Sequence, residues 1–128
     1  MAAGLRATVE RRIKSFGYAF AGWRFVLQTQ ANARIHAVIS VGVMALALWL
    51  EIGRLEWVGL ILTLMIVWMA EFTNTAIEVV VDLVMPDAHP LAKAAKDVAA
   101  ATVLVGALGA IVVGLLILAP PLWQRLGG

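Results

Sequence analysis

Three carboxylates and one amide lie in a stretch of the sequence that is otherwise apolar. Residues 70–82 read AEFTNTAIEVVVD and follow an uncharged run that begins at Trp57. Successive residues of a helix are separated by about 100°, so the later three polar residues lie at roughly −60°, −20° and +20° from the first. These four residues, which we call the acidic stripe, are Glu71, Asn74, Glu78 and Asp82. One acid at a helix end is usually a solvated boundary, but four polar groups on one face of a membrane helix indicate a functional site.

The acidic stripe has the groups that phosphoryl transfer requires. Carboxylate oxygens that keep some water suit Mg²⁺, which proteins bind through one or two carboxylates plus substrate phosphates. A carboxylate held away from water is a candidate general base toward an alcohol. Side chains expected at the same depth from other helices are Arg11, Lys14, Gln30, Arg34, Lys96 and Asp97. The basic members suit a polyphosphate, so the set describes phosphoryl transfer to a lipid alcohol, with a proton- or cation-conducting protein as the alternative.

Several other chemistries are excluded by missing residues. The sequence contains no G-x-x-x-x-G-K-[ST] motif and no protein-kinase catalytic loop. It contains no cysteine, which excludes disulfides, thiolate zinc sites and cysteine nucleophiles. The net charge of +2 is too small to suggest a nucleic-acid partner.

The composition is that of an integral membrane protein. The chain has 128 residues, of which 62% are hydrophobic and 14% charged, and this excludes an ordinary soluble protein. Since a membrane-spanning helix needs about 20 residues, three apolar runs are long enough. We predict an all-α single membrane domain with a surface helix at about 5–28 and spans at about 31–50, 57–85 and 91–119. Pro86 ends the second span, because the residue before a proline avoids helical geometry, and Pro120 with Pro121 ends the third.

Lysine and arginine residues are distributed unevenly about the predicted spans. Six of the ten lie before or at the start of the first span, two lie at the start of the third, and the remaining two fall on the other side. The positive-inside rule therefore places the N-terminus and the acidic end of the second span in the cytoplasm. The charged N-terminal region lacks the short apolar core of a cleavable signal peptide. We expect a multi-pass protein whose site faces the cytoplasm.

The predicted surface helix has an apolar face and a basic face. Apolar residues recur at spacings of three and four, which is typical of a helix lying in the membrane interface. Arg11, Lys14 and Tyr18 follow a separate line along the same helix. Anchoring alone would explain them. The alternative is that they also contact a phosphate or an adenine, since guanidinium groups bind phosphate oxygens well.

Polar residues also mark the cytoplasmic ends of the first and third spans. Gln30 and Arg34 are one helical turn apart and could both face the acidic stripe, where we assign Arg34, with Glu71, to the lipid substrate. For His36 we expect only capping and snorkelling. The short connection after Pro86 returns Lys96 to the level of Asp82. Further along the third span, a line of small residues allows helices to approach closely, and oligomerisation would bury the polar surface.

The chain strongly resembles the small prokaryotic diacylglycerol kinase family, which includes the undecaprenol kinases. The resemblance covers about residues 13–118 and rests on two ordered motifs, E-x-x-N-T-A-I-E-x-V-V-D at 71–82 and A-K-D at 95–97. It implies a homotrimer of three-span subunits in the bacterial inner membrane. It also implies transfer of the γ-phosphate of Mg-ATP to a membrane lipid alcohol.

The resemblance also implies roles for individual residues. Glu71 matches the proposed general base and Glu78 matches a metal ligand. Residues that match other active-site positions are Asn74, Asp82, Lys96 and Asp97. Residues that match nucleotide-contacting positions are Arg11 and Tyr18 on the surface helix and the turn from Asp87 to His89.

Two features leave questions open within the family. Gln30 stands where the best-known members have a second metal-ligating glutamate, so either the affinity for Mg²⁺ or the number of metal ions is in question. Residues 32–36 and 81–83 look more like the undecaprenol-kinase branch, whereas the family name and many relatives favour diacylglycerol. The rival outside the family is a small oligomeric channel or transporter that uses the acidic stripe as a cation or proton path, against which Lys96 and the basic surface helix argue. A purely structural membrane protein would leave the acids unexplained.

Overall fold

The computed structural model describes residues 2–127, with side-chain surroundings described from Arg11 onward. Every regular element in this range is a helix: α1 (Ala2–Thr29), α2 (Ala31–Leu50), α3 (Arg54–Val84) and α4 (Pro90–Arg125). The all-α prediction is thus confirmed. The chain forms two compact units, residues 1–31 and residues 32–128, which are described separately. That the whole chain acts as one membrane domain stays a prediction.

Three of these helices, α2, α3 and α4, are long and apolar enough to cross a membrane. Their large aliphatic side chains are mostly exposed in the single chain, as on Val38, Ile66 and Leu116. Such surfaces suit lipid or other membrane helices and not water. The chain is therefore a membrane protein, as its composition predicts.

The first unit consists of α1, which begins and ends close to the predicted surface helix. Ile13, Phe16 and Phe20 are exposed on it. Arg11, Lys14 and Tyr18, separated by three and four residues, are also exposed and share one face of this helix. Its location in the membrane interface stays a prediction.

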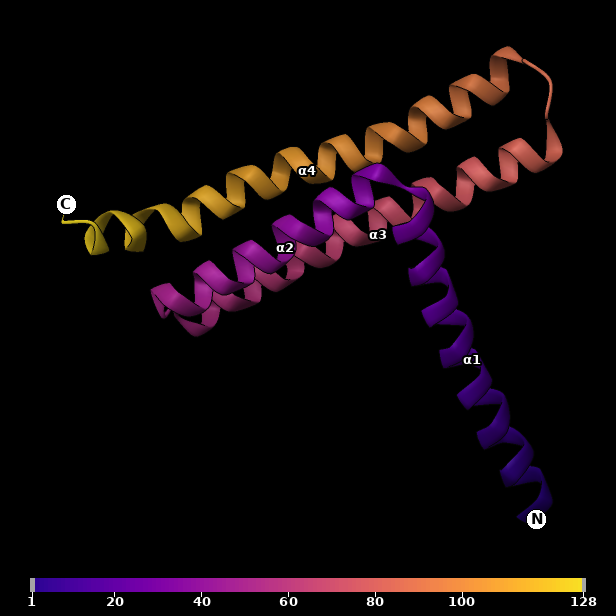
Figure 1. Ribbon diagram of the computed structural model, residues 1–128, viewed down its shortest axis with the longest axis horizontal. Helices are drawn as coiled ribbons and strands as arrows, with labels where there is room; N and C mark the ends of the chain where they lie inside the picture. The colour runs from indigo at the N-terminus through magenta and orange to yellow at the C-terminus, as the bar shows by residue number, and fades with distance from the viewer. Residues whose placement is uncertain (1, 128) are drawn as a thin grey trace. The chain divides into compact units, whose positions relative to one another are not determined.

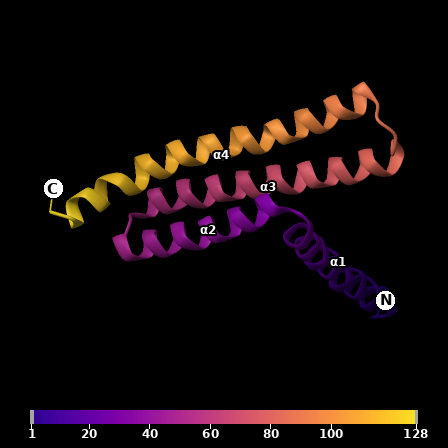
Figure 2. The same cartoon turned by 45° about the horizontal axis from the view of Figure 1, so that its top comes forward.

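The second unit is a bundle of α2, α3 and α4, in which α3 runs antiparallel to both of its neighbours (Figure 1). A view turned by 45° shows α3 between α2 and α4, with α4 extending along α3 (Figure 2). These two helices approach each other closely at Gly106, where a Cβ atom would lie 3.7 Å from the Val67 Cα atom. Within the line of small residues on α4, Gly106 thus serves helix packing inside the chain, as expected of small residues in membranes, whereas a Cβ atom at Gly114 would meet nothing within 4 Å.

An apolar cluster fills the end of the bundle at the α2–α3 turn. Its buried residues are Ala47, Leu50, Ile52, Leu60 and Leu118. They come from all three helices and from the turn, so this cluster ties the bundle together at one end. The acidic stripe lies toward the opposite end of α3.

Local sequence explains where α3 and α4 begin and end. Glu56 caps the start of α3 by accepting a hydrogen bond from the Gly53 backbone N–H, and α3 ends at Val84, just before Pro86 as predicted. His89 caps α4 by accepting a 3.2 Å hydrogen bond from the Leu91 backbone N–H. Pro90 occupies the first turn of α4, where its missing N–H costs nothing.

The predicted end of the third span at Pro120 and Pro121 is wrong, because α4 continues through both prolines to Arg125. A proline has a helical φ and removes only one hydrogen-bond donor of the helix. Membrane helices tolerate such interruptions. The last turn is completed by the Leu126 N–H, which donates to the carbonyl groups of Leu122 and Trp123.

Candidate active site

The acidic stripe changes from buried to exposed along α3. Glu71 is 1% exposed and Asn74 is 7% exposed, although both are polar. Glu78 is half-buried, and the side chain of Asp82 is 64% exposed. The stripe thus has one end closed off from solvent and one end open to it.

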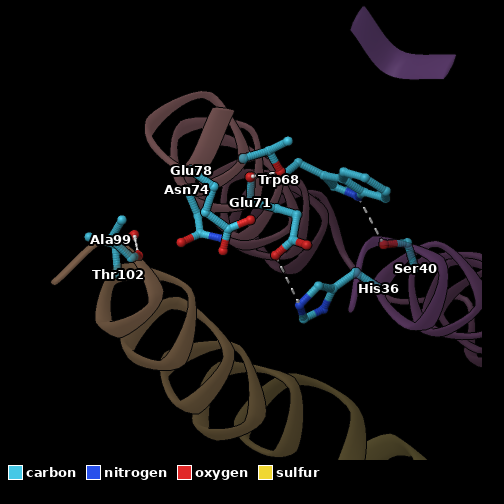
Figure 3. A network of polar contacts seen from close by, with 9 residues as sticks. His36, Ser40, Trp68, Glu71, Asn74, Glu78, Ala99 and Thr102 are labelled. Atoms are coloured by element: carbon cyan, nitrogen blue, oxygen red, sulfur yellow. Dashed lines mark hydrogen bonds and ion pairs between the residues drawn. The ribbon is translucent and has the colours of Figure 1, made fainter. Parts of the chain in front are cut away.

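The Glu71 carboxylate lies between α3 and α2. Its Oε2 atom is 3.9 Å from Nε2 of His36, whose side chain is 16% exposed (Figure 3). The backbone amide of Ala33 also interacts with this carboxylate. Within the described chain, Oε2 has no hydrogen-bond partner. Buried polar atoms are usually hydrogen-bonded, so this oxygen requires an explanation.

Asn74 and Glu78 are joined by a hydrogen bond of 3.0 Å from Nδ2 to Oε1. The spacing of four residues puts the two side chains one turn apart on the same face, as predicted. Their side chains leave α3 close together in Figure 3. Oδ1 of Asn74 is buried and has no hydrogen-bond partner among the described residues. The amide therefore orients Glu78 with one end and presents an unused acceptor with the other.

Lys96 connects α4 to the exposed end of the acidic stripe. Its Nζ atom donates to both carboxylate oxygens of Asp82, at 3.0 and 3.2 Å. The sequence predicts that Lys96 returns to the level of Asp82, and the structure confirms this. A cation is thereby held at the open end of the site.

An open cavity of about 700 Å³ surrounds the connection between α3 and α4. Residues at its wall that the sequence predicts for nucleotide binding or catalysis are Asp82, Asp87, His89 and Lys96. Lys93 also lines it and forms an ion pair with Asp97 within α4. Asp97 thus pairs along its own helix, and it is absent from the cavity wall.

The remaining predicted residues lie in the first unit and at the start of α2. Arg34 is exposed on α2, and its assignment to the lipid substrate stays a prediction. Arg11, Lys14, Tyr18 and Gln30 belong to the first unit, where the first three are exposed and Gln30 is half-buried. Their assignments to nucleotide and metal binding also stay predictions.

Sequence reasoning missed the position of His36. We expected a capping or snorkelling side chain, but its ring turns toward Glu71 (Figure 3). One turn further along α2, Ser40 accepts a 3.2 Å hydrogen bond from Nε1 of Trp68 on α3. At these two turns, α2 and α3 therefore face each other with polar side chains. The only signal in the sequence was that His36 and Ser40 are spaced for one face of the first span.

The donor atoms of the stripe fit a magnesium ion that keeps other ligands. Glu78 offers a carboxylate, and Asn74 offers the buried, unpartnered Oδ1 beside it. Among the described residues, no three histidine, cysteine or acidic side chains converge as a complete metal cage. Mg²⁺ does not require such a cage, because it commonly uses one or two carboxylates with substrate phosphates and water.

Comparison with known proteins identifies the family. Residues 17–118 match the family model described as prokaryotic diacylglycerol kinase. The chain belongs to this family. It is 38% identical over 117 residues to an undecaprenol kinase of Bacillus subtilis, covering 91% of this chain and 95% of the relative. It is 32% identical over 117 residues to a diacylglycerol kinase of Escherichia coli K12, covering 91% and 93%.

A third relative is a diacylglycerol kinase of Synechocystis, 44% identical over 109 residues. That match covers 84% of this chain but 62% of the relative. Relatives of both names thus match the segment that holds the acidic stripe. Membership in this family makes the chain a lipid kinase.

Proposed function

We propose that this protein transfers the γ-phosphate of Mg-ATP to the hydroxyl group of a membrane lipid alcohol, either diacylglycerol or undecaprenol. The observation that carries the proposal is the change in burial along the acidic stripe. A lipid hydroxyl and a polyphosphate require surroundings of opposite polarity. The stripe provides both within three turns of one helix.

Glu71, at the buried end, is the proposed general base. In the reaction it accepts the proton of the lipid hydroxyl while the lipid oxygen attacks the γ-phosphorus. Its burial keeps bulk water from competing as the phosphate acceptor. General-base catalysis of this kind contributes a factor of about 10² to 10⁴ to the rate.

Lys96 and Asp82, at the exposed end, are the proposed binding site for the phosphates. The ammonium group of Lys96 lies at the wall of the open cavity and compensates phosphate charge. Asp87 and His89 line the same cavity and are candidates for nucleotide contacts. Arg11, Lys14 and Tyr18 of α1 are further candidates, because they present two cations and an aromatic ring along one helix face.

Magnesium would be held by Glu78, with Asn74 beside it and Gln30 as a further ligand. When bound, the ion neutralises charge on the phosphates and orients them for transfer. The hydrogen bond from Asn74 Nδ2 orients the carboxylate of Glu78. An amide oxygen from Gln30 adds a ligand without adding negative charge.

A homotrimer with a cytoplasmic site completes the proposal. The three spans of a single chain leave most of their apolar side chains exposed, which is compatible with contacts between copies as well as with lipid. Lysine and arginine residues are concentrated before α2 and around the start of α4. By the positive-inside rule, this distribution supports a cytoplasmic acidic stripe.

The test is ADP release by purified protein in lipid-detergent micelles that contain Mg-ATP and diacylglycerol, undecaprenol or no added lipid alcohol. Turnover should require one of the two alcohols, and the preferred alcohol identifies the substrate. Glu71→Gln is the control, and it should abolish turnover. If folded protein shows no turnover with either lipid but conducts ions into vesicles without ATP, the kinase proposal is wrong and the channel alternative is favoured.

A further inference from the structure

We propose that His36 is the positioning residue for Glu71: its Nε2–H group donates a hydrogen bond to Oε2 and holds the carboxylate ready for the lipid hydroxyl. This inference rests on the proposed function, because it assigns Glu71 the role of general base. It replaces the boundary role that the sequence suggests for this histidine. The evidence comes from the carboxylate, from the histidine and from the cavity beside them.

The first observation is the unsatisfied oxygen of Glu71. The residue is 1% exposed, and its Oε2 atom has no hydrogen-bond partner in the described chain. A buried carboxylate oxygen without a donor loses the hydrogen bonds that water would supply. Its rotamer is then poorly determined, which is a disadvantage for a base that must meet its substrate in one orientation.

The second observation is that a ring nitrogen faces this oxygen. His36 Nε2 lies 3.9 Å from Glu71 Oε2, about 1 Å longer than a hydrogen bond (Figure 3). Catalytic hydrogen bonds are often long in structures without substrate and shorten in the complex. A small rotation of either side chain brings the two atoms into contact.

The third observation concerns a mostly apolar cavity of about 420 Å³ between α2, α3 and α4. Among the described residues, His36 is the only ionisable one in its wall, and Glu71 does not line it. Two hydroxyl groups in the same wall are already used, since Ser40 accepts from Trp68 and Thr63 donates to the Gly59 carbonyl. His36 therefore has two neighbours: it lines the cavity, and its Nε2 atom faces the carboxylate of Glu71.

This arrangement assigns a defined tautomer to His36. As a neutral ring with hydrogen on Nε2, it donates to Glu71 without forming an ion pair that would reduce the basicity of the carboxylate. In the transfer, the lipid O–H proton moves to Glu71, the lipid oxygen bonds to the γ-phosphorus, and the bond from that phosphorus to the departing ADP oxygen breaks. His36 keeps its proton throughout and only fixes the direction of the base.

The first experiment compares His36→Gln with His36→Leu, using lipid-dependent ADP release. The glutamine amide places an N–H donor near the position of the histidine Nε2 atom, while leucine has a similar bulk without a donor. We expect His36→Leu to lower kcat at least tenfold, the scale of a misoriented catalytic group, with the KM for ATP unchanged. His36→Gln should stay within about threefold of the native kcat, because it restores the hydrogen bond.

Ser40→Ala is the matched control, because Ser40 lines the same cavity one turn away on α2. It should leave kcat unchanged. If His36→Gln and His36→Leu lose activity equally, or if neither loses it, the inference is wrong. If His36→Leu misfolds, His36→Ala takes its place. Native activity in His36→Gln together with a loss in His36→Ala would support the donor role, and equal activity in these two variants would contradict it.

A second measurement does not depend on turnover. With ¹⁵N-labelled histidine, the native protein in micelles should show His36 as the neutral tautomer with hydrogen on Nε2, and Glu71→Gln should shift its resonances. A tautomer with hydrogen only on Nδ1 would overturn the inference. The proposed function is tested separately: it fails if the native protein shows no lipid-dependent turnover, and the assignment of Glu71 as general base fails if Glu71→Gln retains that turnover.

Discussion

The two ends of the helical bundle differ in the burial and pairing of their polar groups. At the α2–α3 turn, the apolar cluster is packed from aliphatic side chains, and two exposed charges nearby, on Arg125 and Glu51, form an ion pair at 3.1 Å. The guanidinium group of Arg125 also lies 5.0 Å from the ring centre of Trp49. At the acidic stripe, two buried oxygens, on Glu71 and Asn74, lack partners within the described chain.

This difference indicates which end is built for stability and which for chemistry. Buried polar groups without partners cost free energy of folding, so proteins keep them mainly where a ligand or a reaction uses them. Membrane helices add to this cost, since the hydrocarbon core offers no water. The apolar cluster can stabilise the bundle at the end where nothing has to bind. The following predictions test this division, in order of decreasing effect.

The largest effect is expected from Glu71→Gln. Loss of a general base should lower kcat by about 10² to 10⁴-fold. Resistance to unfolding should not fall, because the substitution removes a buried charge that has no complete set of partners. The measurements are ADP release and SDS-induced unfolding in mixed micelles.

Glu56→Gln is the matched control, since Glu56 is an exposed acid at the other end of the same helix. It should leave kcat unchanged. Equal loss of kcat in the two variants would remove the distinction between the ends of α3.

The second effect is a loss of stability at the apolar cluster. Leu60 is 2% exposed, and Leu60→Ala should lower the free energy of unfolding by about 2 kcal/mol through the cavity it leaves. The KM for ATP should not change. Leu62→Ala removes the same atoms from a 53%-exposed position on α3 and should have little effect on unfolding. A loss for Leu62→Ala as large as that for Leu60→Ala would show that the cluster has no special role.

The third effect contrasts two exposed ion pairs at opposite ends of the bundle. Lys96→Gln should raise the KM for ATP about tenfold, the scale of one charge-assisted hydrogen bond to phosphate, and leave unfolding nearly unchanged. Arg125→Gln breaks the other pair and should alter neither quantity measurably. If both variants raise this KM, the effect is one of general surface charge.

The smallest effect concerns the metal. Gln30→Glu should lower the Mg²⁺ concentration needed for half-maximal rate by about threefold, because a carboxylate binds the ion more strongly than an amide. Gln28→Glu adds the same charge at an exposed position two residues earlier and should not change this concentration. An unchanged requirement in Gln30→Glu would exclude Gln30 from the metal ligands.

Features that depend on one helix could be predicted from the sequence. The spans follow from their length and apolar composition, and the end of α3 follows from Pro86. The bond between Asn74 and Glu78 follows from their spacing of four residues. Even the contact of Lys96 with Asp82 was predictable, because a short connection leaves the start of α4 little choice of position.

Features that depend on rotation between helices could not be predicted. Whether His36 meets Glu71 depends on how α2 is turned about its axis, and a histidine at a helix entrance is equally suited to capping. The resemblance assigns Asp97 to the active site, and which way this side chain faces between the helices could not be predicted; in the structure it forms an ion pair with Lys93 on its own helix. The continuation of α4 through Pro120 shows that a proline signal is weaker in a membrane helix than in water.

The central claim is that the buried and exposed ends of the acidic stripe have separate tasks, and binding of a non-hydrolysable Mg-ATP analogue tests it most directly. The analogue is titrated into native protein, Glu71→Gln and Lys96→Gln in the same lipid micelles. Glu71→Gln should bind it with a Kd within about twofold of the native value, and Lys96→Gln about tenfold more weakly. Equal weakening in both variants, or unchanged binding in Lys96→Gln, would contradict the claim.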